Sequence, residues 1–169
     1  MSDPRYLNQQ EIDWFVARGI SAIDIVSPDP IQVVHGHSCP EGYLNLDTEG
    51  PRWFAIPQPK GGVFWRPEAG ALASEWGNVF ALGEELIFNP GTTALGQSLP
   101  IYADPLSWLR HSRFGLVVLK WQLAFDQLRD VSRVAVDERV IRLYRRHMRP
   151  PSMPVVSIMR AKEARHEHA

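Results

Sequence analysis

The chain has 169 residues, of which 44% are hydrophobic and 22% are charged, with a formal net charge of −1. These values are close to the averages of globular proteins, and the length suits a single domain. The chain has no apolar run of roughly 18 residues and no basic-then-apolar start, which argues against a membrane span and a secretion signal. Its single cysteine excludes an internal disulfide framework and favours a reducing, cytoplasmic location.

The low net charge conceals an asymmetry along the chain. Residues 1–90 contain twelve Asp and Glu and five Lys and Arg, a formal charge of −7. Residues 91–169 contain seven Asp and Glu and thirteen Lys and Arg, a formal charge of +6. Two interpretations follow: the halves attract each other within the fold, or the basic half offers a surface to an anionic partner.

The first half predicts one helix followed by short strands. Asn8, with Glu11 three residues later, forms a capping box, and apolar residues then recur at helical spacing until Gly19. The stretch "SAIDIV" (residues 21–26) predicts a short strand. Between residues 31 and 67, the apolar stretches are separated by "CPEG", "TEGP" and "PKGG", whose Pro and Gly favour turns. The apolar stretches are "IQVVHGH", "GYLNLD", "RWFAIPQP" and "GVFWRP". Their rhythm predicts an antiparallel β-meander.

The second half alternates helices and strands. Residues 70–87 leave strand, bulge and helix open, and residues 89–97 predict a loop. Asp104 followed by Pro105 predicts the start of a short helix. We then expect a buried strand in "FGLVVLKW", a helix in "QLAFDQLRD", a strand in "SRVAV", a helix in "DERVIRLYRRHMRP" capped by Asp137, and a strand in "MPVVSIM". Such alternation predicts some parallel strand pairing.

Together these elements predict an α+β fold. An antiparallel β-meander in the N-terminal half packs with an alternating helix/strand C-terminal half around one core. Core packing best explains five of the tryptophans, Trp53, Trp65, Trp76, Trp108 and Trp121. We expect a single domain over residues 1–160 and a mobile C-terminal tail over residues 161–169.

Two histidines and the only cysteine stand at alternate positions, as His35, His37 and Cys39. On a strand their side chains would share one face, with the histidines about 6.6 Å apart along the chain, and imidazole and thiolate are both zinc ligands. The further ligand could be Glu41, Asp47, His111 or His147. The chain has no second ligand cluster, so a strand that enters a turn at Cys39-Pro40 is the structural alternative. A redox or nucleophilic cysteine is the third possibility.

Two segments resemble known families. "HGHSCP" (residues 35–40) is similar to the HGHxCPG signature of the zinc-associated FmdE-like family, but Glu41 follows the proline where that family has glycine, so no residue role is transferred. "WRPEAGALASEWGNVFALGEELIFNPGT" and "YADPLSWLRHSRFGLVVLKW" resemble uncharacterised small bacterial proteins of prophage-like or integrated mobile elements. That resemblance implies a mobile-element context and favours nucleic acid as a partner; it implies no activity, cofactor or site residue.

The expected helix over residues 137–150 is rich in arginine. Val140, Leu143 and Tyr144 recur at the spacing of a core-facing stripe. The remaining sides carry Arg139, Arg142, Arg145, Arg146 and Arg149. Arginine binds phosphate in a bidentate manner, and Tyr144 beside it could meet an exposed base. A solvated helix face paired with the acidic half, or a contact for an acidic protein, are the alternatives.

We therefore predict a non-catalytic binding or adaptor protein of a bacterial or phage-like element. Its arginine helix would contact nucleic acid, or else an acidic protein surface, and no membrane. The alternative function is a small metal-dependent enzyme with a zinc site at His35 and His37. Apart from that zinc, no cofactor is expected, since the chain contains neither a phosphate-binding loop motif nor a GxSxG motif.

Overall fold

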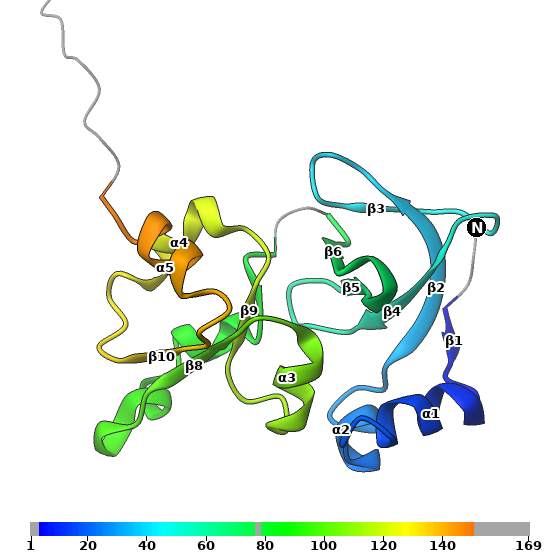
Figure 1. The fold of residues 1–169 in the computed structure, drawn as a ribbon, viewed down its shortest axis with the longest axis horizontal. Coiled ribbons are helices and arrows are strands. Elements are labelled where there is room, and N and C mark those ends of the chain that lie inside the picture. The colour runs from blue at the N-terminus through cyan, green and yellow to red at the C-terminus, as the bar shows by residue number, and fades with distance from the viewer. Residues whose placement is uncertain (1–3, 77–78, 151–169) are drawn as a thin grey trace, which may run out of the picture.

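Two β-sheets organise the part of the chain that the computed structural model describes, residues 4–76 and 79–150 (Figure 1). The N-terminal half forms an antiparallel sheet, and the C-terminal half contributes most of a mixed sheet. With the helices around them they give the predicted α+β fold. Within the described ranges, no helix has the length and apolar character needed to cross a membrane.

The first sheet is the predicted meander. Its strands run in the order β1-β2-β4-β5-β6, and β3 pairs with the far end of β2. The strands are β1 (Arg5–Tyr6), β2 (Gln32–Ser38), β3 (Leu44–Leu46), β4 (Arg52–Ile56), β5 (Val63–Arg66) and β6 (Ala71–Ser74). Alternate side chains point to opposite faces, and both faces are buried: Phe54 and Ile56 enter one core cluster, while Trp53 and Ala55 enter another.

The meander curls until its two ends meet. Tyr43, next to β3, forms a bridge with Ser74 at the end of β6, and the Ser74 N–H donates to the Gly42 carbonyl over 2.9 Å. The curl needs close backbone approach over β2. A Cβ on Gly36 would lie 2.4 Å from the Asn45 carbonyl oxygen, so only glycine fits there. Gly36 itself lies within β2, between the two histidines.

Two helices lie beside the meander, and one of them corrects a prediction. α1 (Gln9–Val16) begins with the predicted capping box, in which the Glu11 N–H donates to the Asn8 side chain over 3.0 Å. Residues 22–26 form the helix α2 (Ala22–Val26), so the strand predicted over residues 21–26 is wrong. The physical reason is the cap: the Ser21 hydroxyl accepts a hydrogen bond from the Ile23 N–H.

The second sheet runs in the order β10-β8-β9-β7. β8 pairs in parallel with β9 and with β10, as the alternation predicted, whereas β7 is antiparallel to β9. Its strands are β7 (Ala81–Leu82), β8 (Leu99–Tyr102), β9 (Leu116–Val118) and β10 (Val134–Val136), and the helices are α3 (Pro105–Arg110), α4 (Ala124–Leu128) and α5 (Ile141–His147). Single 3₁₀ turns or short runs occupy Pro67–Ala69, Glu84–Ile87, Pro90–Gly96 and Trp121–Leu123.

The C-terminal helix starts later than predicted. Asp104 caps α3 as expected, but Val140, not Asp137, is the cap residue of α5. The Asp137 carboxylate instead accepts hydrogen bonds from the backbone and the guanidinium of Arg139, which hold a turn before the helix. The strand predicted over residues 153–159 and the tail over 161–169 lie outside the described residues.

The two halves share the largest core cluster. Phe15 and Ile25 from the helices and Trp65 from the meander pack with Trp108 and Val117 from the C-terminal half. Two smaller clusters fill the inner face of the meander and the space between the mixed sheet and α4. Among the tryptophans assigned to the core, Trp53, Trp65 and Trp108 are buried and Trp121 is partly buried. Trp76 is the exception, with 73% of its surface exposed.

Candidate functional site

The histidine and cysteine residues of the predicted zinc site lie on β2 and the turn that follows it. His37 is exposed and its Nε2 lies 3.6 Å from Asp47 Oδ2. The Cys39 sulfur accepts a hydrogen bond from the Asn45 side chain over 3.0 Å, and its N–H donates to the Tyr43 carbonyl. Cys39 therefore opens the tight turn between β2 and β3, as the structural alternative predicts.

Asp47, one of the further ligands proposed for zinc, lies beside His37, whereas two others lie on distant helices. His111 caps α3, where its ring stacks on Tyr102 at 4.8 Å, and His147 on α5 packs near Trp121. Within residues 4–76 and 79–150, no group of three or more His, Cys, Asp and Glu side chains is arranged to hold a metal ion. His35, His37 and Cys39 as zinc ligands stay a prediction.

The structure separates Arg139 from the other arginines of the predicted interface. Its guanidinium lies 2.6 Å from an oxygen of Asp137 and 2.6 Å from one of Asp104, and it also donates to the Ser107 hydroxyl. These contacts hold the pKa of Asp137 at about 2 and raise that of Arg139. Arg139 thus ties the start of the α5 region to the cap of α3.

The other four arginines converge. They surround a hollow of about 270 Å³ whose lining residues are Arg142, Arg145, Arg146 and Arg149. Their spacing of i, i+3, i+4 and i+7 places them on one side of α5 and its C-terminal extension. All four are exposed, whereas Tyr144 packs against the second-sheet cluster, so the guanidinium groups are what a partner would meet. Leu143, predicted to face the core, is partly exposed instead.

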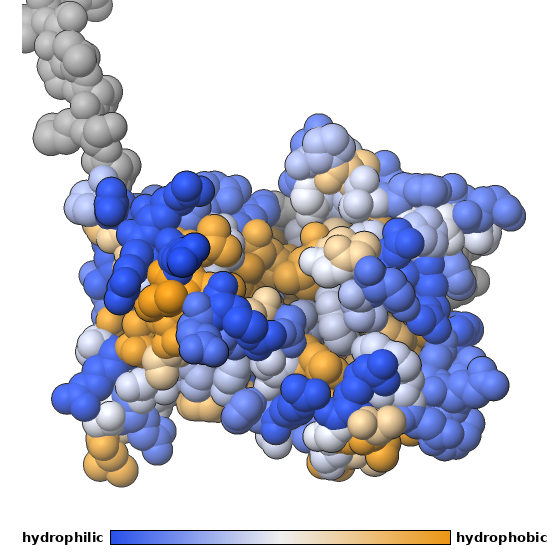
Figure 2. Space-filling model, viewed as in Figure 1, coloured by the Kyte–Doolittle hydropathy of each residue, from blue (hydrophilic) through white to orange (hydrophobic). Residues whose placement is uncertain are grey.

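The arginines around this hollow, which we call the arginine cluster, form no ion pair with an acidic side chain that the structure describes. Each ion pair found among the described residues joins residues of the same half of the chain. Two arginines join the halves through backbone acceptors: Arg110 donates to the Arg18 carbonyl and Arg113 to the Asp24 carbonyl. Burial lowers the pKa of Arg113, and its role is to join α2 to the second half. In Figure 2, strongly hydrophilic side chains over α4 and α5 lie beside an apolar patch on the same part of the surface.

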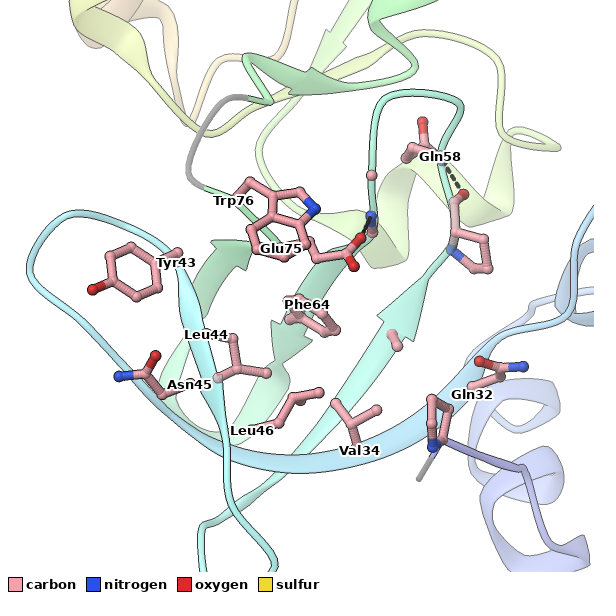
Figure 3. A pocket seen from close by; sticks show the side chains of 15 residues that line it. Gln32, Val34, Tyr43, Leu44, Asn45, Leu46, Gln58, Phe64, Glu75 and Trp76 are labelled. Carbon is pink, nitrogen blue, oxygen red and sulfur yellow. Dashed lines mark hydrogen bonds between the residues drawn. The ribbon is translucent and has the colours of Figure 1, made fainter. Parts of the chain in front are cut away.

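A second concave surface was missed by reasoning from the sequence. A hollow of about 720 Å³ opens on the inner face of the curled meander, with Val34, Leu44 and Phe64 in its floor (Figure 3). The one indication in the sequence is Trp76, an aromatic residue that is exposed in the structure. Because the pattern of residues 70–87 did not predict a helix or a strand, it did not predict that Trp76 would be exposed.

The chain was compared with known proteins by sequence and by fold. No family model, no curated protein and no solved structure matches it.

Proposed function

We propose that this protein is a non-catalytic binding protein that contacts the phosphates of nucleic acid through the arginine cluster on α5. The supporting observation is the hollow of about 270 Å³ lined by four guanidinium groups. Guanidinium groups bind phosphate oxygens in a bidentate manner, and phosphate contacts provide most of the affinity of sequence-independent binding. The resemblance to proteins of integrated mobile elements supports a role in such an element, where nucleic acid is the natural partner.

The cluster is a poor arrangement for stability alone, which favours a binding role. Like charges three or four positions apart on a helix each cost about 0.2–0.5 kcal/mol. Two such pairs lie within α5, namely 142–145 and 142–146, and Arg149 follows just beyond the end of the helix. The helix dipole favours cations only near the C-terminus, so it accounts for Arg145 and Arg146 and not for Arg142 in the first turn. A phosphate in the hollow would offset the repulsion.

Binding of fluorescently labelled single-stranded and duplex DNA, followed by anisotropy from 50 to 200 mM salt, tests this function. If all four arginines meet phosphates, the slope of log K against log salt is about −3.6 for duplex and about −2.8 for single strands. The affinity then falls about 150-fold for duplex and about 50-fold for single strands over that range. We expect Arg142→Gln/Arg146→Gln to halve the slope.

The matched control is Arg129→Gln/Arg133→Gln, which removes the same charge from exposed positions outside the hollow. This variant should keep at least three quarters of the wild-type slope. An equal loss in both double variants would show attraction by net charge alone and overturn the proposal. Tighter binding of polyglutamate than of DNA would also overturn it, in favour of an acidic protein partner.

A further inference from the structure

The hollow of about 720 Å³ in the meander has the size of a site for a small molecule. Its volume falls in the range of about 300–1,000 Å³ that such sites occupy, and its floor is formed by buried apolar side chains of β2, β3, β4 and β5. Figure 3 shows Val34, Leu44, Leu46 and Phe64 pointing into it. Leu46 is 41% exposed although it lies on a strand, so the hollow leaves apolar surface in contact with solvent.

The charge around this hollow has one sign. Among the residues that the structure describes, Glu75 is the one acidic residue that lines it, and no Lys, Arg or His does. The N-terminal half that builds the hollow carries a formal charge of −7. A ligand with an ammonium group therefore meets a complementary potential, whereas a carboxylate or phosphate meets repulsion.

Glu75 and Trp76 stand together at the rim, above the apolar floor (Figure 3). The β4–β5 turn holds them: Glu75 Oε2 accepts a hydrogen bond from the Gly62 N–H over 3.1 Å. Gly61 has a φ of +117°, and a Cβ there would lie 3.4 Å from Glu75 Oε2 and 3.6 Å from Trp76 Cδ1. The turn thus supports a carboxylate next to an exposed indole, the two groups that attract an organic cation.

We propose that the meander hollow binds a small hydrophobic amine. Its apolar body would lie on Phe64, Leu44 and Leu46, and its ammonium group would lie between the Glu75 carboxylate and the Trp76 ring. This site is separate from the arginine cluster, which lies on α5 and requires an anion.

Three probes with one hydrocarbon body test the proposal by isothermal titration calorimetry: 1-naphthylmethylamine, 1-naphthalenemethanol and 1-naphthoate. We expect the ammonium form to bind several-fold more tightly than the alcohol and the carboxylate to bind most weakly. Glu75→Gln should remove about a two- to fivefold preference for the amine over the alcohol, as expected for an exposed charge pair. Trp76→Leu keeps an apolar wall and should weaken amine binding about two- to fivefold through loss of the cation–π contact.

A charge introduced at the rim gives an independent test that does not disturb the core. Leu46→Lys should weaken the amine at least tenfold, while Leu123→Lys, at a position of similar exposure outside the hollow, should leave it unchanged. Equal affinity for the three probes, or loss of binding in both lysine variants, would overturn the proposal. Stable self-association that the amine does not reverse and that Leu46→Lys abolishes would also overturn it, because the hollow would then be an interface between copies.

Discussion

Replacing Arg142 by glutamine should make the folded protein more stable at low salt while weakening its binding to nucleic acid. Arg142 lies in the first turn of α5, and Arg145 and Arg146 follow it three and four positions later. Within the ranges the structure describes, its guanidinium forms no ion pair that would be lost. Glutamine has nearly the same helix propensity as arginine, so the substitution changes chiefly the charge.

The expected gain is about 1 kcal/mol in the free energy of unfolding. Two like-charge pairs are relieved, each costing about 0.2–0.5 kcal/mol, and removal of a cation from the helix N-terminus adds about 0.3 kcal/mol. Salt at 1 M shortens the screening length to about 3 Å, so most of the gain should disappear there.

Urea unfolding followed by tryptophan fluorescence, at 20 mM and at 1 M salt, measures this gain as an increase in midpoint at constant slope. Arg133→Gln is the matched control: it removes the same charge, but the Arg133 guanidinium donates to the Gly96 carbonyl over 3.2 Å, so no gain is expected. Destabilisation by Arg142→Gln at low salt would refute the reasoning, because it would mean that an acidic group pairs with Arg142. The arginines would then serve the fold, as the alternative interpretation of the charge asymmetry holds.

Three further predictions concern the buried Glu84, the paired Asp137 and the predicted zinc site. Glu84→Ala should lower the free energy of unfolding, measured in urea, by about 2–4 kcal/mol, because the buried Phe80 N–H loses its acceptor at 2.8 Å. Lys60→Ala should lower it by less than about 1 kcal/mol, because Lys60 is exposed. The pKa of Asp137 is lowered from 3.8 to about 2, so its ionised form stabilises the fold: that stability is complete above about pH 4 and is lost as the pH falls through 2. Asp137→Asn should therefore make the free energy of unfolding depend less on pH in this window, as measured by urea unfolding at several pH values. Purified, dialysed protein should hold far less than one zinc per chain by elemental analysis; a ratio near one that His37→Ala abolishes would instead establish the metal site.

Local patterns predicted the elements well where one residue and its near neighbours decide the backbone. The capping box at Asn8 and the Asp104-Pro105 helix start need only contacts within one turn, and the meander needs alternation and Pro/Gly turns. The error at residues 21–26 has the same local origin. A serine cap and an alternating pattern compete over six residues, and the cap prevails because only Ile25 of that stretch must be buried.

Contacts between distant residues account for what the sequence could not predict. Arg139 belongs with the other arginines by spacing, yet Asp104, thirty-five positions earlier, removes it from the cluster. The hollow in the meander depends on the curl that joins Tyr43 to Ser74, and on Gly36 lying against the backbone of Asn45. The residue pattern within a single strand does not predict which distant strands will contact each other.

The charge asymmetry of the chain gains a physical meaning from these contacts. If opposite charges served mainly to hold the halves together, ion pairs should cross between them. In residues 4–76 and 79–150 no ion pair crosses; the halves are joined mainly by an apolar cluster and by arginines that bind backbone carbonyls, and Arg113 is also attracted by Asp24 and Asp29 of the acidic half. The arginine cluster and Glu75 are therefore not used in ion pairs between the halves. An acidic half with an apolar hollow suits an organic cation, and a basic helix with a guanidinium-lined hollow suits phosphate, so binding at the two sites should be independent at high salt.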